Sequence, residues 1–210
     1  MALGFVLAAM NTVFYEAIAR LPLATVGAIE FLGPIIVAAA GARTRRNLAA
    51  LILAVGGVYV LTDVRLAGSV PGYVFAFANC GLFILYILLG HRIASSGGGT
   101  SGIDRLGTAM LVASVAALPV GFRAALPAFN DPVLLAAAIG VGVSSSVIPY
   151  VCDQLAMRRL ARATFALLLA LLPATATAIG FLVLHQVPTL AELLGIALVI
   201  GGVALHRAEA

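Results

Sequence analysis

Long apolar runs, separated by short breaks that carry arginine, aspartate, proline or glycine, dominate the chain. The runs are apolar on all sides and do not alternate, which excludes membrane-spanning strands. A helix needs about 20 mostly apolar residues to cross about 30 Å of hydrocarbon. The pattern therefore predicts an all-α membrane protein with about eight transmembrane helices, at residues 2–19, 22–40, 48–61, 70–89, 106–122, 132–155, 164–184 and 190–205.

Composition supports this interpretation. Apolar residues make up 63% of the chain and charged residues 10%, against about 45–50% and about 25% in soluble domains. A soluble fold of 210 residues has too little interior to bury this fraction, so the lipid bilayer must be the solvent for most of the surface. The net charge of +4 lies in the short breaks and forms no basic stripe, which argues against nucleic acid as a partner.

Several kinds of chemistry are excluded by what the chain lacks. Its twelve basic residues are all arginine, so neither a Walker-type phosphate loop nor a Schiff-base lysine is present. Cys80 and Cys152 lie inside apolar runs with no ligand or disulfide spacing. No zinc-protease motif or Ser/His/Asp arrangement is visible, and the three histidines lie at helix ends. We therefore expect no metal site and no enzyme activity.

The distribution of arginine predicts the orientation, because cytoplasmic loops carry an excess of positive charge. The breaks alternate between the two sides of the membrane. One side holds nine arginines, at Arg43, Arg45, Arg46, Arg92, Arg105, Arg158, Arg159, Arg162 and Arg207, and the other holds Arg20, Arg65 and Arg123. Both termini are therefore expected in the cytoplasm, as an even number of helices requires.

The chain also contains a weak internal repeat. Thr25 precedes Pro34 by nine residues, and Thr164 precedes Pro173 by nine, at a constant offset of 139. With a six-residue insertion, Gly56-Gly57-Val58 maps onto Gly201-Gly202-Val203. The copies are five helices apart, an odd number, so they cross the membrane in opposite directions. An inverted-topology repeat of this kind is typical of secondary transporters.

The repeat predicts two units. Residues 1–66 would be a partial first repeat of three helices, and residues 67–210 a second repeat of five. Symmetry then places two further helices before Met1. We expect the chain to be part of a ten-helix fold of two inverted five-helix repeats.

Local motifs resemble a known family. Asn11-Thr12-Val13-Phe14-Tyr15, followed by Glu30-Phe31-Leu32-Gly33-Pro34, resembles the EamA type of the drug/metabolite transporter superfamily, closest to its threonine/homoserine exporter branch. Pro149-Tyr150, Arg162-Ala163-Thr164-Phe165 and Pro173 fit the second repeat. Where the family usually has Gly-Glu after the ninth helix, this chain has His185-Gln186. The resemblance implies a bacterial inner-membrane exporter driven by an ion or exchange gradient, without a bound cofactor.

Glu30 is the sharpest candidate for a binding residue. It lies mid-run, about nine residues from either end, where an ionised carboxylate costs at least a few kcal/mol. It could accept a substrate ammonium group or a coupling proton, or it could form a structural hydrogen bond. Asp153 is expected to form an interfacial ion pair with Arg158, with a role in coupling as the second interpretation.

Other polar residues share helix faces at spacings of four and seven. We expect the pairs Asn11 and Tyr15, Tyr150 and Gln154, and Asn79 and Tyr86 to line a central cavity. Asn11 maps onto Tyr150 at the repeat offset. Helix–helix hydrogen bonding, worth only about 0.6 kcal/mol on average, is the competing interpretation.

Smaller structural roles are expected elsewhere. Glu16 and Arg20 should pair on one helix, and Ser144, Ser145 and Ser146 should return hydrogen bonds to their own backbone. Pro34 and Pro173 are equivalent in the repeat and could be hinges, or could simply give each helix a fixed shape.

The sequence as a whole predicts a secondary active exporter of small polar metabolites, with amino acids such as threonine or homoserine favoured by the resemblance. Its partners would be the substrate, a proton or exchange counter-substrate and the lipid bilayer, and a homodimer is compatible with this interpretation. The alternative is a non-transporting membrane subunit or an inactive fragment.

Overall fold

The computed structural model describes residues 1–61, 69–95, 102–185, 187 and 189–206. Every regular element among these residues is a helix, which confirms the all-α prediction. In chain order the elements are α1 (Ala2–Ile18), α2 (Leu23–Gly41), α3 (Arg45–Leu61), α4 (Val70–Ser95), α5 (Gly102–Phe129), α6 (Pro132–Gly142), η1 (Val143–Val147), α7 (Ile148–Arg159), α8 (Arg162–Leu168), α9 (Leu171–Leu184) and α10 (Leu190–Leu205).

The helices match the eight predicted runs, with differences in length and continuity. The largest extensions are in α4, which ends at Ser95, and in α5, which continues through Pro119 and Pro127 to Phe129. Four helical stretches of the described chain are long and apolar enough to cross a membrane, namely Val70–Ser95, Gly102–Arg123, Pro132–Arg159 and Arg162–Ile179. The apolar helices at Ala2–Ile18, Thr25–Gly41 and Leu190–Leu205 are shorter. The boundary proposed between the repeats, after residue 66, lies outside the described residues.

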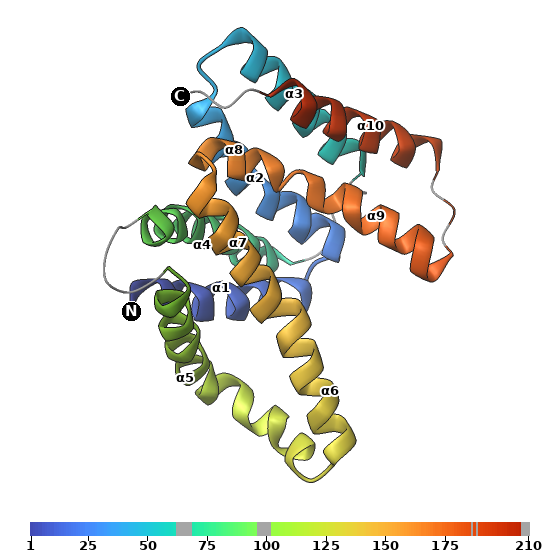
Figure 1. The fold of residues 1–210 in the computed structure, drawn as a ribbon. Coiled ribbons are helices and arrows are strands. Elements are labelled where there is room, and N and C mark those ends of the chain that lie inside the picture. The colour runs from blue at the N-terminus through green and yellow to red at the C-terminus, as the bar shows by residue number, and fades with distance from the viewer. Residues whose placement is uncertain (62–68, 96–101, 186, 188, 207–210) are drawn as a thin grey trace.

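Pairs of helices that are distant in sequence pack side by side (Figure 1). The first three helices each pack against a helix from the other part of the chain: α3 against α10, α2 against α4 and α8, and α1 against α4 and α5. The helices α5 and α6 form a hairpin that extends away from the rest of the bundle. This interleaving brings residues of the first 61 positions next to α4 and α7.

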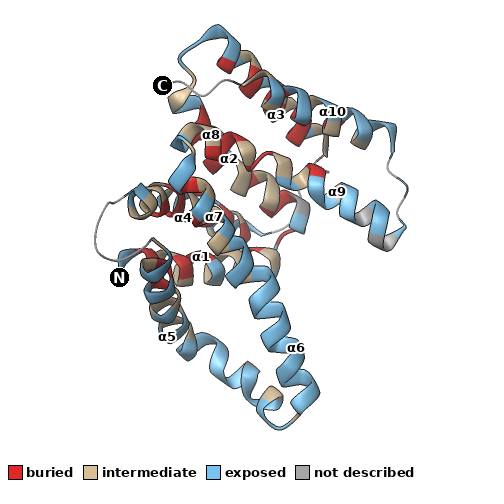
Figure 2. Ribbon diagram, in the orientation of Figure 1, coloured by how far each residue is buried: buried red, intermediate tan, exposed pale blue. Residues whose placement is uncertain are grey.

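Exposed residues cover much of the molecule, above all on the α5–α6 hairpin (Figure 2), and many of them are large and apolar. Val115, Phe129 and Ile139 are 66%, 63% and 59% exposed. Monomeric soluble proteins rarely expose continuous apolar surface on this scale. The hairpin is therefore suited to lipid, in agreement with the composition.

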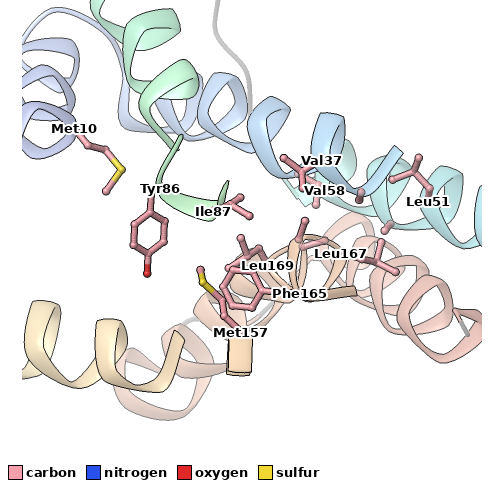
Figure 3. Close-up of a cluster of buried hydrophobic side chains, with 14 of the residues drawn as sticks. Met10, Val37, Leu51, Val58, Tyr86, Ile87, Met157, Phe165, Leu167 and Leu169 are labelled. Atoms are coloured by element: carbon pink, nitrogen blue, oxygen red, sulfur yellow. The ribbon is translucent and has the colours of Figure 1, made fainter. Parts of the chain in front are cut away.

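The main apolar core lies where α1, α2, α4, α7 and α8 converge (Figure 3). Tyr86 and Ile87 of α4 are 1% and 0% exposed, and they lie between Met10 of α1 and Met157 of α7. Phe165 of α8 extends the same core toward α2 and α3. The core therefore fixes α4 against α7, the two helices that hold most of the polar side chains discussed below.

Backbone contact between α3 and α10 is made possible by glycine. A Cβ atom on Gly57 would lie 2.5 Å from Cγ2 of Val199, and one on Gly202 would lie 2.7 Å from the carbonyl oxygen of Ala50. The preceding glycines, Gly56 and Gly201, have no atom within 4 Å of such a Cβ position. The two glycine pairs that the repeat relates thus behave alike, with the second member of each pair at the contact.

Two of the predicted helices are irregular just before a proline. Pro149 follows a π-helical turn, η1, and Pro173 follows the break between α8 and α9. Proline lacks the N–H that would bond the carbonyl four residues earlier, which favours a rearrangement of the preceding turn. The prolines were visible in the sequence, but only the structure shows which turn opens. In contrast, α2 runs through Pro34 without a break.

Candidate functional site

A polar cluster is formed by side chains of α1, α2, α4 and α7, some buried, some partly buried and one, Asn11, exposed. The Glu30 carboxyl of α2 faces the Asn79 amide of α4. Asn79 is fully buried, and neither its amide nitrogen nor its amide oxygen has a hydrogen-bond partner among the described residues. The Asn79 amide is thus close enough to act on the Glu30 carboxyl, but the two groups do not have the geometry of a hydrogen bond. A buried, unpaired amide next to a carboxyl is a place where a polar ligand gains interactions that the protein does not supply.

Asn11 and Tyr150, which the repeat relates, contact each other. Nδ2 of Asn11 donates to the Tyr150 hydroxyl at 3.4 Å and to the Leu7 carbonyl at 2.9 Å. The contact joins α1 to α7 at an exposed Asn11. The inverted repeat that would relate the two residues stays a prediction.

Tyr86 connects the cluster to a second carboxyl group. Its hydroxyl donates a 2.6 Å hydrogen bond to Oδ2 of Asp153, and its ring centroid lies 5.6 Å from that of Tyr150. No ion pair joins Asp153 to Arg158 among the described residues, so the expected interfacial pair is wrong. The two residues are five positions apart, which puts their side chains about 140° apart around the helix. Asp153 instead shares the inward face with Tyr150.

Tyr150 lies between the two carboxyl groups. Glu30, Asp153 and Tyr15 all act on it electrostatically. Neither Glu30 nor Asp153 forms an ion pair among the described residues. The cluster therefore has an excess of acceptors and no fixed cation, an arrangement that suits a cationic or ammonium-bearing ligand and disfavours an anion.

Two predicted site residues take peripheral positions. Tyr15 is 66% exposed and packs edge-on against Phe14, although it still acts electrostatically on Tyr150. Gln154 is buried one turn after Tyr150 on α7, where its Nε2 lies 3.5 Å from the Gly90 carbonyl oxygen. Gln154 thus packs α7 against α4, and its unpaired Oε1 does not face Glu30.

The predicted hinge prolines differ in their surroundings. Pro34 is buried beside Leu51 of α3 and Leu167 of α8. Pro173 is partly buried near the start of α9, just after the helix break. The two positions are therefore not equivalent in this conformation, and their role as hinges stays a prediction.

Several contacts outside the cluster follow the sequence analysis. Glu16 and Arg20 form the expected ion pair, and Arg20 also lies over the Phe75 ring. Ser144 and Ser145 bond the carbonyl oxygens of Gly140 and Val141, as expected. The family-specific position at His185-Gln186 is described only in part: His185 is exposed with a positive φ of 54°, and Gln186 lies outside the described residues.

The sequence analysis assigned Asp153 to an ion pair at the membrane interface because the residue lies near the end of its apolar run. The helical spacing was the better signal, since Tyr150 and Asp153 are three positions apart and share a face. Its partner Tyr86 could not be identified from the sequence, because α4 and α7 are 67 positions apart at this contact.

A family model describes most of the chain. Residues 70–207 match the EamA-like transporter family. The protein therefore belongs to this family of membrane transporters.

Individual relatives are consistent with this family. The chain is 29% identical over 200 residues to the threonine/homoserine exporter RhtA of Salmonella typhimurium strain SL1344, and 28% identical to RhtA of Escherichia coli strain K12. Each alignment covers 94% of this chain and 66% of the relative, so the chain spans a little under two thirds of their length. A protein of known crystal structure has a TM-score of 0.70 at 21% identity, over 95% of this chain and 72% of its own. This last likeness supports the fold.

Proposed function

We propose that the protein is a secondary active exporter of small polar metabolites in the bacterial inner membrane, and that its substrates are amino acids such as threonine or homoserine. The observation that carries this proposal is the Glu30 carboxyl beside the unpaired amide of Asn79, inside a helix bundle. An intramembrane carboxylate without an ion pair is a functional-site candidate by default. The names of the relatives supply the substrate class.

In this mechanism the ammonium group of the substrate binds Glu30, while Asn11 and Tyr150 orient its hydroxyl or carboxylate group. Two inverted repeats, residues 1–66 and 67–210, would rock about the contact between Asn11 and Tyr150 and expose the site to each side in turn. Export would be driven by a proton or an exchanged counter-substrate, with no bound cofactor.

Efflux from cells tests the proposal. Cells expressing the chain and loaded with labelled threonine or homoserine should lose label faster than cells without it. Glu30→Gln should abolish the difference while the protein remains in the membrane. Glu16→Gln is the matched control, because Glu16 lies at a helix end in an ion pair with Arg20. If Glu30→Gln and wild type export equally, Glu30 is not part of the site. If wild type exports no amino acid, the alternative of a non-transporting subunit gains support.

The orientation is tested separately. With both termini in the cytoplasm, a cysteine placed at Arg159, in the basic segment that ends α7, should react with a membrane-impermeant thiol reagent only after the cells are opened. A cysteine placed at Asn130, between α5 and α6, should react in intact cells. The opposite pattern would invert the proposed topology.

A further inference from the structure

The Asp153 carboxyl is a second ionisable group in the interior of the bundle, and the mechanism above leaves it without a role. It lies on α7 within the apolar stretch Pro132–Arg159, and it is partly buried. Its hydrogen-bond partner among the described residues is the Tyr86 hydroxyl, which donates to Oδ2. One phenol donor does not replace the hydration that a carboxylate loses at this depth. The group therefore needs a cation or a proton.

The groups that face Asp153 supply no cation. Tyr86 approaches it from α4 and Tyr150 lies one turn earlier on α7, while Glu30 reaches the same tyrosine from α2. The remaining charged groups on the neighbouring helices are near helix ends. His91 of α4 is within hydrogen-bond distance of the Leu160 carbonyl oxygen. Arg92 in the last turn of α4, and Asp104 and Arg105 at the start of α5, are each engaged in other interactions. Arg158 points to another side of α7, and Arg162 is the exposed first residue of α8.

The two carboxyl groups occupy different ends of the cluster. Glu30 faces Asn79 and Asp153 bonds Tyr86, and these partners are seven residues apart on α4, or about 10 Å along the helix axis. However, both act on Tyr150, so each still senses the charge of the other. Two carboxylates in one poorly solvated site resist being ionised together, and one positive charge relieves both.

We propose that Asp153 holds the exchanged proton when the site is empty, and that binding of a substrate ammonium group at Glu30 releases this proton to solvent. This inference rests on the proposed function and adds the coupling ion and its residue. The unpaired Asn79 amide marks the substrate end of the cluster, and the Tyr86 hydroxyl marks the proton end. Proton and substrate then occupy the site alternately, which is the requirement for exchange. Positive charge is conserved, with one proton leaving for each ammonium that binds.

Calorimetry on the purified full chain tests the proposal with L-homoserine as the probe. Titrations in two buffers with different ionisation enthalpies count the protons released per homoserine bound. Wild type should release close to one proton at low pH, and its affinity should fall about tenfold for each further pH unit of acidification. Over the pH range in which wild type releases the proton, Asp153→Asn should bind homoserine without proton release and with little change of affinity with pH. Asp131→Asn, at the N-cap of α6 where asparagine caps as well as aspartate, is the control.

Each outcome has a clear consequence. If Asp153→Asn releases as many protons as wild type, the inference is overturned while the proposed function stands. A wild type that binds neither homoserine nor threonine overturns both. If Asp153→Asn does not fold, Tyr86→Phe takes its place: it removes the donor to Oδ2 of Asp153, so proton release should move to a different pH range. An unchanged pH range in that variant would overturn the inference.

Discussion

The Tyr86 hydroxyl of α4 donates a 2.6 Å hydrogen bond to Oδ2 of Asp153 on α7. This contact joins the two helices that converge on the polar cluster, and it lies beside the packed rings of Tyr86 and Tyr150. It explains why Asp153 is directed inward.

Replacing Tyr86 with phenylalanine should lower the stability of the protein. The ring packing is kept, but the bond to Asp153 is lost, and hydrogen bonds between membrane helices are worth about 0.6 kcal/mol on average and up to about 2 kcal/mol. Thermal unfolding in detergent should show a decrease of this size. Tyr59→Phe is the control, because Tyr59 is 75% exposed on α3. Equal melting temperatures for the two variants would show that the bond does not contribute.

Replacing Asn79 with leucine should separate stability from binding. The variant removes a buried amide that has no partner, and an unpaired buried polar group costs about 1–3 kcal/mol. We expect an unfolding temperature equal to or above that of wild type, together with loss of homoserine binding in calorimetry. Ala78→Leu, at the adjacent exposed position, should leave both unchanged. Full binding by Asn79→Leu would remove Asn79 from the site.

Adjacent glycines on α3 should respond to alanine in opposite directions. At Gly57 the new methyl group would meet Val199 and the Gly195 carbonyl oxygen at 2.5 and 2.6 Å, and such overpacking costs about 1–3 kcal/mol. At Gly56 there is open space, so Gly56→Ala should stabilise the helix by about 0.5–1 kcal/mol. Thermal unfolding of the two variants measures the difference. Similar melting temperatures would contradict the close packing of α3 on α10.

A charge on the α5–α6 hairpin should impair insertion into the membrane. Ile139 is 59% exposed in an apolar helix, and a lysine at the centre of a membrane span costs about 2.5–3.5 kcal/mol on insertion scales. Ile139→Lys should reduce the amount of protein that resists extraction from membranes by alkaline carbonate, whereas Ile139→Leu should not. Normal extraction resistance for Ile139→Lys would show that this face does not contact lipid.

The sequence by itself determined the solvent and the secondary structure. Lipid offers no hydrogen-bond partners, so the backbone of an uninterrupted apolar run such as residues 70–89 must form its hydrogen bonds within its own segment. Helices therefore follow from composition and length. The same argument directed Glu30 toward the protein interior, because a charged side chain is costly in hydrocarbon and is tolerated where it faces a partner or a cavity. These inferences need only local information.

The partners of each polar group were decided by the tertiary structure. Asp153 has Arg158 near it in sequence and Tyr86 near it in space, and only the packing of α4 on α7 selects the tyrosine. The π-helical turn before Pro149, the peripheral position of Gln154 and the unpaired amide of Asn79 depend in the same way on neighbouring helices. An apolar stripe specifies that a helix is buried in lipid or protein, but it does not specify its rotation, and the rotation determines which side chains meet.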